Sequence, residues 1–283
     1  MAKSTEASFE STEPIASSLL VRVLGTSADA VDEALRRFTA YQLRNVERIL
    51  QRADAKSRSA EESSSVSLRV AHVLLEDGSY CDDELMADYL GGLLAGSRTP
   101  EGRDDRAVAW SKVLTSLSSL QVRAHYLLYR EWAARLRTVA VYELGVDAGR
   151  MQATMEVASS EFVKFLVAES EVDENDAISH AIGGLARVGL LEDKYLYNND
   201  AVRVVPSIMG IELYGWAQGL PGLSPRGFAS KAQPFDLEDA IPRLSSVIFS
   251  KLPERAEVKP QAGQRQVQIQ AQRQGRRVKR RDS

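Results

Sequence analysis

Residues 177–205 read AISHAIGGLARVGLLEDKYLYNNDAVRVV, and two different periodicities meet within them. Apolar residues recur at three- and four-residue steps through Ala177–Val188, which predicts a helix that stops at Gly189. The second half alternates around an Asn-Asp pair, which predicts a short hairpin within Lys194–Val205. A helix, a hairpin and a further apolar helix in this order predict a winged-helix-like α+β module over residues 151–220.

Only helical periodicity is found upstream of this module. Val31–Leu50 and Asp82–Gly96 carry apolar residues at helical spacing, without strand-like alternation. We therefore predict a helical domain over residues 19–150, preceded by a polar, disordered N-terminus at residues 1–18. Met155–Leu166 is likewise predicted to be an amphipathic helix.

The composition changes again beyond the module. Residues 221–252 are expected to be a linker, with one short helix at Phe235–Phe249. Residues 253–283 are rich in Gln and Arg and nearly free of large apolar side chains, which predicts a disordered basic tail. The expected fold class is mainly α: a helical domain, a small winged-helix-like module and this tail.

Positive charge is concentrated at the end of the chain. The net charge of the whole chain is −3, yet residues 259–283 hold eight basic residues and one acidic residue, so the rest is strongly acidic. A basic tail on an acidic body indicates a contact with nucleic acid or with an acidic protein, or a merely solubilising end. The expected contact residues are Arg273, Arg276, Arg277, Lys279, Arg280 and Arg281.

Neither a membrane span nor a secretion signal is apparent. The most apolar stretch, Ile15–Leu24, is shorter than the roughly 18 residues that a span needs and contains Ser17, Ser18 and Arg22. A single cysteine, Cys81, excludes an internal disulfide. We expect a cytoplasmic protein without membrane contact.

Residues typical of catalysis are scattered. His72, His125 and His180 fall on three predicted helices without metal-ligand spacing. Gly91–Gly96 does not follow a strand, so its glycines indicate close helix packing rather than a phosphate loop. The sequence predicts no cofactor, no metal site and no catalytic residue.

One polar cluster is unusual for its density of charge and aromatic hydroxyls. A loop rich in Arg and Asp is followed by a helix on which His, Tyr and Arg recur four residues apart. We predict that Arg98 or Arg106 pairs with Asp104, Asp105 or the region Tyr126–Arg130, which ties the loop to this helix. A ligand or partner site is the alternative, and an enzyme built on the cluster is a third hypothesis. The cluster comprises Arg98, Asp104, Asp105, Arg106, His125, Tyr126, Tyr129 and Arg130.

Two stretches resemble a known family. Asp82–Ser97 followed by Trp110–Leu120 gives a leucine-rich helix, a polar loop and a second helix ending in Leu-Ser-Ser-Leu, an organisation similar to that of the bacterial abortive-infection alpha proteins. Gly184–Leu191 and the later Met209-Gly210 are similar to the winged-helix-like end of that family. The resemblance implies a bacterial anti-phage role, and it brings no catalytic residues with it.

Two functions from different classes follow. The first is a non-enzymatic bacterial interaction protein whose tail touches nucleic acid or an acidic partner. The second is a winged-helix regulator that reads DNA with Ala177–Val188. That helix carries only Arg187 and follows the acidic run Glu169–Asp176, whereas phosphate contacts require basic side chains, so the first function is favoured.

Overall fold

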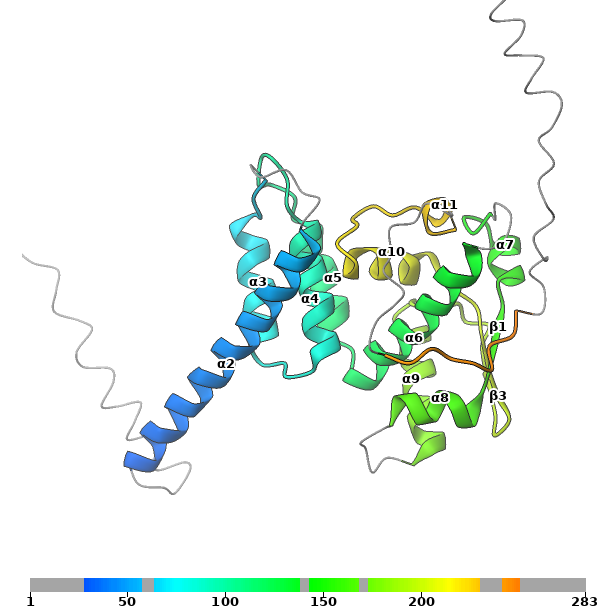
Figure 1. Cartoon of the computed structure of the whole chain (residues 1–283), viewed down its shortest axis with the longest axis horizontal. Helices are drawn as coiled ribbons and strands as arrows, with labels where there is room; N and C mark the ends of the chain where they lie inside the picture. The colour runs from blue at the N-terminus through cyan, green and yellow to red at the C-terminus, as the bar shows by residue number, and fades with distance from the viewer. Residues whose placement is uncertain (1–27, 58–63, 138–142, 168–172, 230–240, 250–283) are drawn as a thin grey trace, which may run out of the picture.

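The computed structural model describes residues 28–57, 64–137, 143–167, 173–229 and 241–249. Within these ranges it contains ten helices and one three-stranded sheet (Figure 1), so the mainly helical fold class is confirmed. The predicted tail at residues 253–283 lies outside the described residues. None of the helices in the described part of the chain is long and apolar enough to cross a lipid bilayer.

The first five described helices lie where the sequence shows apolar residues at helical spacing. They are α2 (Ala28–Lys56), α3 (Leu68–Ser79), α4 (Glu84–Gly96), α5 (Ala107–Thr115) and α6 (Ser119–Leu136). Between Ala28 and Leu136 the described residues form no strand longer than the isolated bridge of Ser65 with Thr99. Figure 1 shows the first part of α2, in blue, extending beyond the other helices.

Glycines allow α4 to lie very close to two neighbours. A Cβ atom on Gly91 would come within 2.5 Å of Arg52 Cβ in α2. A Cβ on Gly92 would lie 1.9 Å from the carbonyl oxygen of Ala217, in the later helix α10. These contacts confirm that the glycines serve close helix packing. Asp83 caps α4, because its side chain accepts from the Met86 amide at 2.8 Å.

Helix α6 lies at the centre of the molecule. Ser118 begins it with a capping box, in which Ser118 and Gln121 each bond the other's backbone amide. Large side chains along the helix, including Trp132 and Tyr129, are fully buried. Elements from both ends of the chain, α4 and the later helices α9 and α10, pack on α6 (Figure 1).

The sheet begins where the sequence predicted a helix. After α7 (Asp147–Gln152), Met155–Ala158 forms strand β1, and only Ser159–Leu166 is helical, as α8. The alternation is visible in the fold, because Met155 and Val157 are buried while Glu156 lies on the outer side. So short a stretch as Met155–Ala158 also fits the apolar spacing of a helix. Its pairing with a distant strand therefore decided that it forms a strand.

The helix and the hairpin predicted in this region are both present. Helix α9 (Glu174–Arg187) ends before Gly189, whose φ of +75° is a left-handed conformation that glycine accepts readily. The hairpin follows as β2 (Leu196–Tyr197) and β3 (Ala201–Val204). All strand pairs are antiparallel, and the strand order is β1-β3-β2, with Met155 opposite Val204.

The last described segments are α10 (Ile208–Ala217), α11 (Pro225–Phe228) and the extended residues 241–249, which we call the strap. The helix expected at Phe235–Phe249 is therefore wrong wherever that stretch is described. Ile248 of the strap forms an isolated antiparallel bridge with Glu156 of β1. An extended segment there satisfies the outer edge of β1, which a helix would leave open.

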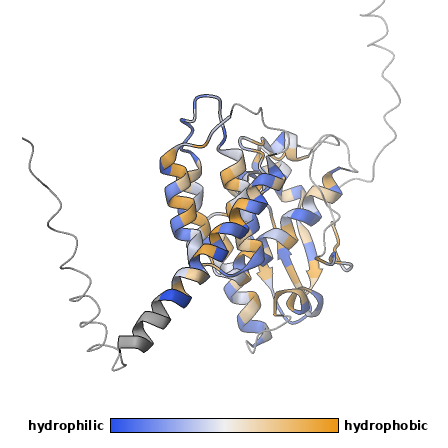
Figure 2. Ribbon diagram, turned by 60° about the vertical axis from the view of Figure 1, so that its left-hand side comes forward, coloured by the Kyte–Doolittle hydropathy of each residue, from blue (hydrophilic) through white to orange (hydrophobic). Residues whose placement is uncertain are grey.

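Buried side chains from α2 to the strap form one continuous apolar core. It includes Ile49 of α2, Trp132 of α6, Val204 of β3 and Leu244 of the strap. In Figure 2 the apolar and polar residues alternate around most helices, as expected for helices that bury one side.

Candidate functional site

The predicted polar cluster divides into two groups in space. Arg106 pairs with Asp104, as expected, at 2.6 Å between Nη2 and Oδ2, but this pair lies within the loop. It lowers the pKa of the Asp104 carboxyl. The Arg106 guanidinium also lies 5.6 Å from the ring centroid of Trp216 in α10. The loop is thus fastened to itself and to α10.

The other charged loop residues point toward α3 and the segment before it. Asp105 pairs with Arg69 at 2.7 Å, and Arg98 donates to the Ser64 carbonyl oxygen at 3.0 Å. The side chains of Asp105 and Arg69 are 52% and 67% exposed. The predicted ion pairs between the loop and α6 are therefore not formed, because those charges find partners nearer in space.

His125 is fully buried on α6. Its Nδ1 shares a 2.7 Å hydrogen bond with the Tyr89 hydroxyl of α4, and its Nε2 lies 3.1 Å from the Gly210 carbonyl oxygen of α10. Burial lowers the pKa of the imidazole to about 3, although the contact with Gly210 opposes this shift. A neutral His125 therefore links α4, α6 and α10.

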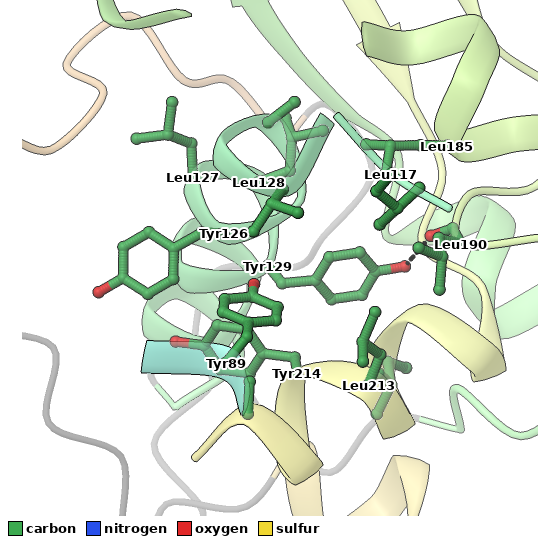
Figure 3. Packing of buried hydrophobic residues seen from close by; sticks show 14 of the residues in the cluster. Tyr89, Leu117, Tyr126, Leu127, Leu128, Tyr129, Leu185, Leu190, Leu213 and Tyr214 are labelled. Atoms are coloured by element: carbon green, nitrogen blue, oxygen red, sulfur yellow. Dashed lines mark hydrogen bonds between the residues drawn. The ribbon is translucent and has the colours of Figure 1, made fainter. Parts of the chain in front are cut away.

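One turn further along α6, Tyr129 makes a second buried link. Its hydroxyl donates to the Leu190 carbonyl oxygen at 2.6 Å and accepts from the Ser207 amide at 3.0 Å. Figure 3 shows the ring among buried leucines and tyrosines, with the bond to Leu190 drawn as a dashed line. Burial raises the pKa of this hydroxyl. Tyr129 thus fixes the ends of the segment that contains the hairpin.

Arg130 is fully buried and holds the start of the strap. Its two terminal nitrogens donate to the carbonyl oxygens of Ile241 and Pro242 at 2.6 and 2.7 Å. Its guanidinium carbon lies 5.3 Å from the ring centroid of Tyr126, which is a cation–π contact. The four cluster residues of α6 therefore serve the packing of distant segments.

Further strap contacts involve residues that the sequence did not single out. Glu131 of α6 accepts from Arg243 at 2.5 Å. Glu161 of α8 accepts from the amides of Ser245 and Ser246 at 2.7 and 2.8 Å and from both hydroxyls. Partial burial opposes ionisation of Glu161, but these hydrogen bonds outweigh it and lower its pKa to about 2. No local pattern marks these glutamates, since their partners lie about 85 to 112 residues away.

Several grooves open on the surface of the described residues, and two of them lie between helices that pack together. A groove of about 640 Å³ lies between α2 and α3 and is lined by apolar residues such as Leu43 and Leu68. A larger one, of about 1240 Å³, lies between the start of α4 and helices α6 and α8. Cys81 lines it half-buried, and burial raises the pKa of its thiol.

The histidines stay apart. His72 lies 3.2 Å from Glu76 on α3, and His180 of α9 shares a 2.9 Å hydrogen bond with Ser118. Among the described residues, no group of three or more histidine, cysteine, aspartate or glutamate side chains is arranged to hold a metal ion. The six basic residues predicted to contact nucleic acid all lie outside the described residues.

These observations define a class: a mainly helical protein with a small antiparallel sheet, in which buried polar residues of α6 bond segments from both ends of the chain. The model of the abortive infection alpha family matches residues 40–205, which is more than half of the chain. The chain therefore belongs to the abortive infection alpha family, as the sequence resemblance indicated. No curated protein and no solved structure matches it. The match runs from α2 through β3, so α10, α11 and the strap lie beyond it.

Proposed function

We propose that the chain is a non-enzymatic interaction protein of bacterial anti-phage defence that acts in the cytoplasm and contacts nucleic acid or an acidic partner through its basic tail. Family membership carries the defence role, since the match covers residues 40–205. The polar cluster supports a structural role for its α6 residues, because His125, Tyr129 and Arg130 each use their polar atoms to hold a distant segment.

The tail supplies the contact in this proposal. Six basic residues fall within residues 273–281, and a run of this kind approaches phosphates without a preformed groove. Residues 259–283 contain no aromatic residue for base stacking. Binding to nucleic acid is therefore expected to be weak, independent of sequence and strongly dependent on salt.

A comparison of two chains tests the tail. The full chain and a chain ending at Pro253 are titrated with duplex and single-stranded DNA over a range of salt concentrations. We expect only the full chain to bind, with an affinity that falls steeply as salt rises. Equal binding by both chains would contradict the proposal and assign the contact to the folded body. Absence of binding by either would favour an acidic protein as the partner.

The alternative is a winged-helix DNA-binding regulator. Its support is the order β1, α8, α9, β2, β3 with strand order β1-β3-β2, which suits a winged-helix-like module at residues 151–220. In such a module α9 would enter the DNA groove. Asp173 caps that helix and Asp176 is exposed in its first turn, whereas Arg187 lies at the far end. Arg187→Ala, made in a chain that lacks the tail, tests the alternative. The alternative requires that this substitution cause a loss of DNA binding.

A further inference from the structure

The strap lies on the body in the manner of a bound peptide. Arg130 donates to two successive strap carbonyl oxygens, and Glu161 accepts from two successive strap amides and their hydroxyls. Ile248 exchanges both backbone hydrogen bonds with Glu156 of β1, at 2.8 and 2.9 Å. Charged clamps on the backbone together with pairing at a sheet edge are the means by which proteins bind extended peptides.

The receiving surface lies on elements other than the strap. Arg130 and Glu131 are neighbours on α6, and with the strap in place they are 0% and 6% exposed. The Tyr126 ring supports the Arg130 guanidinium, and Glu161 is fixed on α8, whose apolar side enters the core. We call the surface made by Arg130, Glu131, Glu161 and the β1 edge at Glu156 the strap channel. Its charged side chains extend from helices α6 and α8, which pack into the core.

The strap is only partly buried. Leu244 is its one fully buried side chain, Ile241, Val247 and Phe249 are half-buried against the core, and the Ile248 side chain is 59% exposed. Within residues 241–249, its pairing with β1 is a single isolated bridge. Segments with few buried apolar contacts open at the lowest free-energy cost in a folded protein.

We propose that the strap channel is a peptide-docking site, occupied by the chain's own residues 241–249, that accepts an extended segment of a partner protein in place of the strap. The charge of the channel defines the matching segment. Glu131 receives an arginine of the segment, and Glu161 receives two serines that lie two and three residues after that arginine. This is the pattern of Arg243, Ser245 and Ser246 in the strap. A segment with carboxylates at these places would be repelled.

Displacement of the strap has a consequence for the end of the chain. The strap ends at Phe249, directly before residues 250–283, which contain the basic run. A partner in the channel would therefore displace the described segment that directly precedes these residues in the sequence. The docking site is separate from the tail's contact and goes beyond the proposed function.

The test opens the strap in the full-length chain. Ser246→Asp removes a hydroxyl donor and places a carboxylate against Glu161, whereas Ser116→Asp adds the same charge at an exposed serine after α5 and serves as the matched control. Hydrogen exchange is first measured over the strap. A labelled peptide with the sequence of residues 241–249, IPRLSSVIF, is then titrated into the wild type and both variants, followed by fluorescence anisotropy.

We expect faster exchange in the strap of Ser246→Asp alone, and peptide binding about tenfold or more tighter than to the wild type, whose own strap competes at high effective concentration. Adding Glu161→Ala to Ser246→Asp should remove this gain. Equal peptide binding by all variants, or an unchanged strap in Ser246→Asp, would overturn the proposal. Dimers of Ser246→Asp whose formation the peptide suppresses would assign the channel to a second copy of the chain instead.

Discussion

At the scale of single residues, burial decides how much a polar side chain contributes to stability. Tyr129 is fully buried, and its hydroxyl bonds both Leu190 and Ser207. The Asp105 carboxylate joins an equally short bond to Arg69, but both groups are well exposed. Exposed pairs contribute little to stability, whereas a buried group left without its partner is costly.

We therefore expect Tyr129→Phe to lower the free energy of unfolding by about 1–3 kcal/mol, because the buried Ser207 amide and Leu190 carbonyl lose their partner. Chemical denaturation measures the change. Asp105→Ala is the matched comparison, with an expected change below about 1 kcal/mol. If Asp105→Ala proved the more destabilising of the two, the assignment of the structural network to α6 would be wrong.

Gly210 shows how a residue without a side chain takes part in this network. A Cβ there would lie 1.9 Å from the Tyr129 hydroxyl oxygen. The glycine thus lets α10 approach both Tyr129 and His125, whose Nε2 lies 3.1 Å from its carbonyl oxygen. Part of the Met209-Gly210 pattern noted in the sequence is explained by this close approach.

At the scale of elements, α4 owes its position to small residues. Gly92 faces the backbone of Ala217 in α10, and the hypothetical Cβ would lie 1.9 Å from its carbonyl oxygen. Gly183 of α9 is also helical, but its nearest neighbour, the Tyr195 hydroxyl, is 4.0 Å from such a Cβ. Comparing substitutions at these two glycines therefore distinguishes the effect of close packing from that of helix propensity.

Gly92→Ala is expected to destabilise the protein by several kcal/mol, on the order of the upper range for overpacking, because backbone atoms must move. Gly183→Ala should instead stabilise it by about 0.5–1 kcal/mol, since alanine is the better helix former and space is open. Thermal unfolding followed by circular dichroism compares the two. Similar effects of both substitutions would contradict the close packing of α4 on α10.

At the scale of the whole molecule, segments from both ends of the chain share one core. Helix α10 packs against both α4 and α6, and Lys56 at the end of α2 donates to the Ala217 carbonyl oxygen at 2.7 Å. The apolar cluster continues from Ile49 to Leu244 without a break. The predicted division at residue 150 thus falls within one continuous core.

We accordingly expect a single cooperative unfolding transition. Tryptophan fluorescence reports on the buried Trp132 and Trp216 and on the half-buried Trp110 of α5, whereas far-ultraviolet circular dichroism reports on all helices. The two denaturant curves should coincide, as they do for two-state proteins. A helical signal that persists after the fluorescence change would show that the N-terminal helices fold independently.

Local sequence determined most of the helices and the hairpin. The helix at Ala177–Val188 with its stop at Gly189, the alternating run after it, and the cap at Ser118 all follow from interactions within a few residues, so periodicity and turn chemistry were sufficient. Family membership also followed from residues that could be read in order along the chain.

Tertiary structure alone decided the rest, because the deciding partners are far away in the chain. Met155–Ala158 became a strand through pairing with β3, about 45 residues later. Asp105 turned to Arg69 rather than to α6, and Arg130 and Glu161 turned to the strap. A side chain's partner depends on which segments the core brings together, and this choice leaves no mark in the neighbouring sequence.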